Sequence, residues 1–300
     1  MKTIIIALFL SVQLFSQEYL FFFDEGITYN GTELITNSID RTMELGSELA
    51  GSVTIANEGS FPFETLTSSG NSITSAINTT GQGRCYGNGI TGNMTVGDKY
   101  KFTCTLTLNS GEQPIVKIRN QAFADITANS TLVNGANSHT MTIISANSTG
   151  SFFFFYNGAA SNWSLANMKL KKMPYWTTTG NHTFDTSLVY KQSGTYSGKI
   201  IASGAGNGTT NTISLASTLF TSATSGTNYR FQVYAYTSTV NTTLTFKLGD
   251  ILLTKDVPTS GMNVLNFDFK ATASTTGNIY LYTNQAATVY LDEASFKSGQ

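Results

Sequence analysis

Residues 152–172 read FFFFYNGAASNWSLANMKLKK, and residues 278–298 read NIYLYTNQAATVYLDEASFKS. The two stretches align without a gap. Their inward-facing candidates are Trp163, Leu165, Met168 and Leu170 in the first, and Val289, Leu291, Ala294 and Phe296 in the second. Successive side chains of a strand point to opposite faces, so these apolar pairs can change parity only where the strand gains one residue. The pattern predicts a β-bulge at the same place in two copies of one domain.

A second pair of stretches supports the duplication. Residues 97–108, GDKYKFTCTLTL, match residues 226–237, GTNYRFQVYAYT, in their glycine, tyrosine, basic residue, phenylalanine and subsequent alternation. Elsewhere short alternating runs recur between clusters of Gly, Asn and Ser, and helix signals are scarce. This is the pattern of a sandwich of short antiparallel strands. The sequence therefore predicts an all-β chain of two tandem β-sandwich domains.

The predicted organisation has four parts. Residues 1–17, MKTIIIALFLSVQLFSQ, have one lysine and then an apolar run, as a secretory signal peptide does. Residues 18–55 have no counterpart in the second copy and are predicted to be an extra strand or an attachment segment. Domain 1 is predicted at 56–173 and domain 2 at 174–300, because Met173-Pro174 separates the copies and proline is excluded from central strands.

Composition limits the function. Charged residues make up 12% of the chain, about half the usual share, and the net charge is −1 with no basic run. The chain therefore has no footprint for nucleic acid. No stretch after the apolar start is suited to crossing a membrane. We expect a secreted or cell-surface protein, with a virion surface as the alternative.

The second copy resembles the jelly-roll carbohydrate-binding module superfamily of the CBM4/CBM22-like kind. Three stretches carry the resemblance: residues 192–200, QSGTYSGKI, residues 226–236, GTNYRFQVYAY, and residues 289–296, VYLDEASF. The first copy matches the second and third stretches loosely. The resemblance implies two antiparallel sheets packed face to face in a jelly roll, with sugar binding on the concave sheet or at the loop end.

The resemblance also implies a structural calcium near the terminal aspartate, which here is Asp292. The same columns of the first copy hold Ala166 and Asn167, so no calcium is implied there. A hard cation needs several oxygen ligands. The competing interpretation of Asp292 is a hydrogen-bonded carboxylate at the bulge, and no other cofactor is expected.

One strand carries the candidate ligand face. In YRFQVYAYT, apolar side chains occupy every second position and are predicted to face the core. The side chains between them, an amide, a guanidinium and two tyrosines, are predicted to face outward. Flat aromatic faces and planar polar groups are what sugars bind. Two tyrosines of a later strand also occupy outward-facing positions, and they are predicted to extend the same binding face. The predicted glycan-binding residues are Arg230, Gln232, Tyr234, Tyr236, Tyr280 and Tyr282. The alternative is that these tyrosines only stabilise the sheet.

Three other features have structural interpretations. Cys85 and Cys104 are predicted to form a disulfide, which export permits, or to be two buried thiols on neighbouring strands. Residues 152–155, four consecutive phenylalanines, predict a strand buried on both faces or covered by a neighbouring chain. Trp163 is predicted to lie in the core, and Trp176 to plug the second domain.

Catalysis is not expected. His139 and His182 are the only histidines and lie among Ser, Thr and Asn, as surface residues do. Glycoside hydrolysis needs two carboxyls that face each other across a cleft, and the adjacent acidic pairs 24–25 and 292–293 would point to opposite faces of a strand. We therefore expect a non-catalytic protein that binds carbohydrate or mediates adhesion by recognising surface glycans. The alternative is a structural protein, such as a virion decoration, fibre or filament subunit, that uses the same domains to self-assemble.

Overall fold

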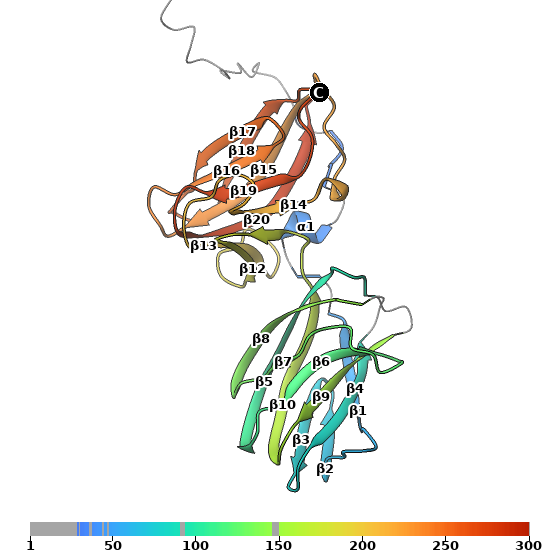
Figure 1. The fold of residues 1–300 in the computed structure, drawn as a ribbon. Coiled ribbons are helices and arrows are strands. Elements are labelled where there is room, and N and C mark those ends of the chain that lie inside the picture. Colours follow the sequence, from blue (N-terminus) through green and yellow to red (C-terminus); the bar gives the residue numbers. More distant parts are fainter. Residues whose placement is uncertain are drawn as a thin grey trace, which may run out of the picture.

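A computed structural model describes Tyr29 and residues 31–35, 38–43, 45–46, 48–90, 94–145 and 150–299. Figure 1 shows two β-sandwiches, one drawn in blue to yellow-green and the other in yellow to red. The first consists of β1 (Ala50–Asn57), β2 (Thr65–Ser69), β3 (Ser72–Asn78), β4 (Gly83–Ile90), β5 (Lys99–Gly111), β6 (Ile115–Asn120), β7 (Ser130–Thr131), β8 (Gly135–Thr142), β9 (Ser151–Asn157) and β10 (Ser161–Lys172).

The second sandwich follows in the same order along the chain. It consists of β11 (Thr177–Thr179), β12 (His182–Ser187), β13 (Ser197–Ala202), β14 (Thr212–Leu215), β15 (Asn228–Thr237), β16 (Thr243–Leu248), β17 (Ile251–Asp256), β18 (Asn263–Lys270), β19 (Ile279–Thr283) and β20 (Ala287–Ser298). The described residues also include a short helix, α1 (Ser38–Thr42), and one turn of 3-10 helix, η1 (Ser217–Leu219).

The two sandwiches have the same topology. The first pairs its strands in the orders β1-β4-β9-β6-β7 and β2-β3-β10-β5-β8, and the second in the orders β11-β14-β19-β16-β17 and β12-β13-β20-β15-β18. Adding ten to each strand number of the first sandwich gives the second. All the strand pairs are antiparallel. The predicted all-β fold of antiparallel sandwiches, consistent with a jelly roll, is confirmed.

The predicted bulge is present in both copies. Between Ala166 and Lys169 of β10, two residues oppose one on β5, and between Asp292 and Ser295 of β20, two residues oppose one on β15. The extra residue has a left-handed backbone in each case, with φ of 55° at Asn167 and 50° at Glu293. The apolar residues on both sides of each bulge are buried, so the change of parity keeps one face of the strand in the core.

Each sandwich encloses its own core. Trp163 is fully buried in the first core, and Phe155 packs against it with ring centroids 6.2 Å apart. Trp176 is 2% exposed in the second core, where its indole N–H donates to the carbonyl of Asp40. Both tryptophans therefore have the structural positions that the sequence predicted.

The four phenylalanines of β9 are buried on both faces of the strand. Phe153 and Phe155 belong to the core, whereas Phe152 and Phe154 lie on the outer face of the sheet. The guanidinium of Arg119 covers Phe154 at 3.8 Å from the ring centroid.

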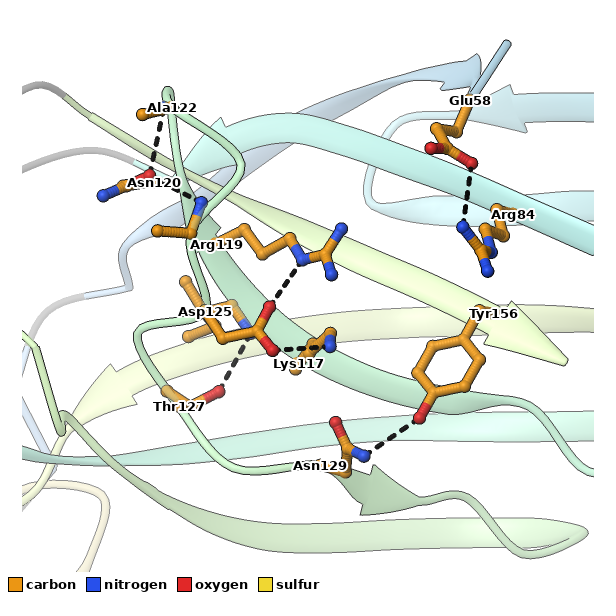
Figure 2. Close-up of polar contacts among 12 residues, drawn as sticks. Glu58, Arg84, Lys117, Arg119, Asn120, Ala122, Asp125, Thr127, Asn129 and Tyr156 are labelled. Carbon is orange, nitrogen blue, oxygen red and sulfur yellow. Dashed lines mark hydrogen bonds and ion pairs between the residues drawn. The ribbon is translucent and has the colours of Figure 1, made fainter. Parts of the chain in front are cut away.

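A loop fixes this outer cover. Figure 2 shows the carboxylate of Asp125 accepting from Lys117 at 2.7 Å and from Arg119 at 2.6 Å. Phe123 packs over Phe152 with ring centroids 5.1 Å apart. The doubly buried strand is therefore covered by residues of the same chain.

Two short segments of the N-terminal region complete one sandwich each. Gly31-Thr32-Glu33-Leu34 runs antiparallel to the end of β20, and Gly46, Glu48 and Leu49 lie beside the end of β10. The amide of Leu34 donates to Phe296, and that of Leu49 donates to Leu170, both at 2.8 Å. We call residues 31–34 the first strap, and Gly46, Glu48 and Leu49 the second strap. The first strap thus pairs with β20, the last strand of the second sandwich.

The segment between the straps joins the second core. Leu34, Ile35 and Met43 are buried in that core, and α1 lies beside the second sandwich (Figure 1). The described residues between 29 and 43 therefore pack on the sandwich that is farther along the sequence. The predicted signal peptide, residues 1–17, lies outside the described residues. Within the described residues, no helix is long and apolar enough to cross a membrane.

The cysteines are free thiols. Cys85 on β4 and Cys104 on β5 are both buried in the first core, and they come from opposite sheets. The predicted disulfide is therefore wrong. The alternative of two buried thiols is confirmed, except that the two residues do not lie on neighbouring strands. Burial raises the pKa of both thiols, that of Cys104 to about 12.

Candidate functional site

A cavity of about 390 Å³ lies on the outer face of the sheet that contains β15 and β20. Alternation along β15 points Arg230 and Gln232 away from the core, as the sequence predicted, and both side chains line this cavity. The first strap and α1 provide another wall. The lining residues are Tyr29, Glu33, Arg41, Arg230, Gln232, Glu293, Ala294, Ser295 and Lys297.

Contacts within the sheet hold Arg230 in place. Its guanidinium donates two hydrogen bonds to the carboxylate of Asp268, the residue opposite it on β18. The ring of Tyr29 stacks on the guanidinium, with 4.2 Å between the ring centroid and Cζ. The hydrogen bond with Asp268 is the main reason that the pKa of Arg230 is raised. Arg230 is therefore a fixed cation with one planar face against an aromatic ring.

Glu33 of the first strap holds one wall of the cavity in place. Its Oε1 accepts from the amide of Phe296 at 2.7 Å, and its Oε2 accepts from the hydroxyl of Ser295 at 2.6 Å. Both carboxylate oxygens are thus engaged in structural hydrogen bonds. This arrangement suits a positioning role and does not provide an acid or base for hydrolysis.

Two buried polar atoms of the lining residues lack a partner. Among the described residues, nothing hydrogen-bonds the hydroxyl oxygen of Tyr29 or Nε of Arg41. Burial is the main cause of the raised pKa of Tyr29. A buried polar group without a partner costs about 1–3 kcal/mol, so these atoms favour a polar molecule in the cavity.

A second cavity, of about 500 Å³, lies at the corresponding place on the first sandwich. In the alignment of the two copies, four lining positions coincide. They are Lys101, Thr103, Lys169 and Lys171 in the first copy, and Arg230, Gln232, Ser295 and Lys297 in the second. The outer face beside the bulge is thus hollowed in both sandwiches. The set is largely basic in the first copy and mixed in the second.

Tyr236 is not exposed, contrary to the prediction of an open tyrosine face. It is 8% exposed, because Tyr190 covers it with ring centroids 4.1 Å apart and Tyr290 packs beside them. Tyr190 adopts a left-handed φ of 49°, and it is 44% exposed. Tyr234 is half-buried on the same face. The predicted platform is therefore covered at this end by the loop that carries Tyr190.

Tyr280 and Tyr282 do not extend the face of β15. Both are half-buried and lie on β19, which belongs to the opposite sheet. They point outward, but on the other side of the sandwich. Burial is the main cause of the raised pKa of Tyr282. The prediction that they join Arg230 and Gln232 is wrong.

Asp292 is fully buried and holds a loop. Its Oδ2 accepts from the amides of Gln192 and Ser193 at 2.8 and 3.1 Å, and its Oδ1 accepts from the amide of Glu293 at 2.9 Å. Burial is the main cause of its raised pKa. These neighbours are N–H donors, whereas calcium needs oxygen ligands. The described residues contain no cluster of three metal-ligating side chains, and the surroundings of Asp292 do not fit a calcium site.

His182 is buried, which corrects its predicted surface position. It is 1% exposed, and its Nε2 lies 3.1 Å from the amide of Thr283, which donates to it. Burial lowers its pKa. The bond identifies His182 as a structural link between β12 and β19. His139 is half-buried on β8.

No protein-family model and no curated protein matches the chain. Among solved structures, the chain is similar to the tandem CBM22 modules from Paenibacillus barcinonensis, at 10% identity and a TM-score of 0.30, covering 90% of this chain and 98% of that one. It is also similar to a CBM22 xylan-binding domain from the same organism, at 16% identity and a TM-score of 0.31, covering 41% and 85%.

A third similar structure holds the CBM22 and GH10 modules of a Clostridium thermocellum endo-1,4-β-D-xylanase complexed with xylohexaose. The identity is 13% and the TM-score 0.33, covering 41% of this chain and 26% of that one. At these TM-scores, the similarities carry no argument about function.

Proposed function

We propose that the protein is a non-catalytic carbohydrate-binding protein, and that it holds sugar in the cavity lined by Arg230 and Gln232. The repetition of a cavity at the same place in both sandwiches supports this proposal most strongly. The size of about 390 Å³ is in the range of small-molecule sites. The lining offers a guanidinium, an amide, a hydroxyl and a carboxylate, which suit the alternating donors and acceptors of a sugar.

Tyr29 and Arg41 add to the support. Their unpartnered atoms need hydrogen bonds that sugar hydroxyls can provide. The ring of Tyr29 is amphipathic, so it can also contact the C–H face of a sugar. Bound sugar would thus rest between the first strap and the outer face of β15.

We further propose that the protein acts outside the cell, either secreted or at a surface, because residues 1–17 have the pattern of a signal peptide. Self-assembly as a structural subunit is the second candidate. The tetra-phenylalanine strand, one of the features that favoured it, is covered within the chain, so this candidate is the weaker one.

A glycan array on the full chain tests the proposal. Gln232→Ala should weaken the glycan signal by about tenfold, because an amide that bonds a ligand in a buried site contributes about 1–2 kcal/mol. Tyr280→Ala, which alters the outer face of the opposite sheet, is the matched control and should bind like the wild type. A chelator should leave the signal unchanged. Absence of any glycan signal, or equal binding by the two variants, would contradict the proposal.

A further inference from the structure

The cavity of the first sandwich lies between the two sandwiches. One wall is the outer face of β5, β8 and β10, and the other is formed by β12 and the residues that follow it. The lining residues are Leu45, Lys101, Thr103, Ser138, Lys169 and Lys171 on one side, and Asp185, Thr186, Ser187, Leu188 and Tyr196 on the other. We call this cavity the interdomain cleft. Its volume is about 500 Å³.

The interdomain cleft carries excess positive charge. Lys101 is paired with Asp185 across it. In the part of the chain that the structure describes, no carboxylate lies within 4.0 Å of the ammonium groups of Lys169 or Lys171. Lys169 is exposed, and Lys171 lies over the ring of Tyr196 at 5.4 Å. Among the described lining residues, three lysines against one aspartate leave two net positive charges, although the whole chain has a net charge of −1.

The sheet fixes how these cations are spaced. Lys169 and Lys171 are two residues apart on β10 and point to the same face, so their Cα atoms lie about 6.7 Å apart. Lys101 is opposite Lys171 on the neighbouring strand, and their Cα atoms lie about 5 Å apart. The three lysines thus form a compact group on one face of the sheet.

We propose that the interdomain cleft binds an acidic polysaccharide, that is, a sugar chain with carboxylate or sulfate groups. This inference rests on the proposed function, because it assigns a ligand class to the second of the two cavities. Lys169 and Lys171 attract the anionic groups. The hydroxyls of Thr103, Ser138 and Ser187 bond the sugar hydroxyls, and Leu188 offers an apolar contact.

The lining favours a sugar chain over a nucleic acid. Nucleic-acid sites use a stripe of basic residues that follows the phosphate backbone, often with aromatic rings on which bases stack. The cleft has a short row of cations among hydroxyl side chains, and its one aromatic ring, Tyr196, already contacts Lys171. An acidic polysaccharide uses all three kinds of lining group.

The experiment measures binding of the full chain to two acidic polymers, each compared with its uncharged form. The carboxylate pair is polygalacturonate and its fully methyl-esterified form, and the sulfate pair is dextran sulfate and dextran. We expect the wild type to bind at least one acidic polymer more tightly than its uncharged form, and more weakly as salt is raised. The two pairs identify which anionic group the cleft takes.

A matched pair of double variants locates the binding. The double variant Lys169→Gln with Lys171→Gln should bind the acidic polymer about tenfold more weakly or worse, since each lost contact contributes on the order of 1 kcal/mol. Lys255→Gln with Lys270→Gln removes the same charge from exposed positions outside the cleft and should change binding less than twofold by the same reasoning. Equal losses in both double variants would overturn the inference, because the attraction would then depend on net charge alone.

Two further outcomes separate this inference from the proposed function. The array can show a glycan whose binding is weakened by Gln232→Ala while the acidic polymers do not bind. In that case the inference fails and the proposed function stands. If neither acidic nor neutral glycans bind, both fail. Single-stranded DNA bound as tightly as the acidic polymer, with the same loss in the double variant of Lys169 and Lys171, would also overturn the inference.

Discussion

The Oε1 atom of Glu48 accepts a hydrogen bond from the amide of Leu170 at 2.6 Å. The first strap repeats this relationship, because Glu33 accepts from the amide of Phe296 in the second sandwich. In both straps the same oxygen also accepts from the amide two residues later. A short Gly-x-Glu-Leu sequence thus completes the last strand of each sandwich by the same hydrogen bonds.

Replacing either strap glutamate should destabilise the sandwich that it completes. We expect Glu48→Ala and Glu33→Ala each to lower the free energy of unfolding by about 1–3 kcal/mol, because each leaves backbone amides without a charged acceptor. Differential scanning calorimetry of the full chain measures the effect. Asp256→Ala, at an exposed position on β17, is the control and should change stability by less than about 0.5 kcal/mol. Strap variants as stable as this control would contradict the prediction.

Asp40 should make stability depend on pH. It is fully buried, its Oδ1 accepts from the amide of Tyr175, and burial is the main reason that its pKa is raised to about 6. Its pKa in the folded chain lies above that in the unfolded chain, so the folded state binds the proton more tightly. Stability from this group therefore rises as pH falls from about 7 to about 4.

The comparison with Asp40→Asn isolates this contribution. The variant keeps the acceptor for Tyr175 and loses the titration. Relative to this variant, the wild type should become more stable by about 2 kcal/mol over that pH range, because the folded chain raises the pKa of Asp40 to about 6. Denaturant unfolding at several pH values measures it. Parallel curves for the two proteins would rule out the role of Asp40.

The bulge residues should reject β-branched side chains. Asn167 and Glu293 both have left-handed backbones, and valine there costs about 1–2 kcal/mol. Valine is otherwise favoured in strands, so Ser164→Val on β10 should be neutral or slightly stabilising. Thermal unfolding of the three variants checks this. If Asn167→Val and Ser164→Val change the unfolding temperature in the same direction, the bulge is not required.

The two thiols should be unreactive until the first sandwich unfolds. Cys85 and Cys104 are buried, and their raised pKa values keep them protonated near neutral pH. Alkylation followed by mass spectrometry should therefore modify neither in the native protein and both in denaturant without a reductant. If reductant is needed for modification, a disulfide is present and the prediction is wrong.

Residue parity was enough to predict the bulge and the identity of the core, because both depend on which side of one strand a residue faces. Trp163 and Leu165 before the bulge, and Met168 and Leu170 after it, are buried as the alternation requires. Tyr280 shows the limit of this reasoning. Its parity indicated an outward position, which is right, but parity does not say which of two sheets a strand joins.

The covered ends of the candidate site could not be predicted in this way. Tyr236 faces outward from β15 and is nevertheless buried, because Tyr190 comes from a distant loop. The straps were missed because four residues form too short a pattern, although the repeat of Gly-x-Glu-Leu at 31–34 and 46–49 was the available signal. The cavity depends on both features, so the residues Tyr29, Glu33 and Arg41 were not foreseen.

The pairing of the first strap with β20 also determines the order in which the molecule can be finished. Residues 31–34 leave the ribosome early, but their partner, β20, lies far downstream in the chain and is made much later. The downstream sandwich is therefore complete only after β20 has been made. A fragment that starts after Pro174 would leave the edge of β20 unpaired and would lack Tyr29, Glu33 and Arg41 of the candidate site. Its failure to bind a ligand would therefore say nothing about the intact protein.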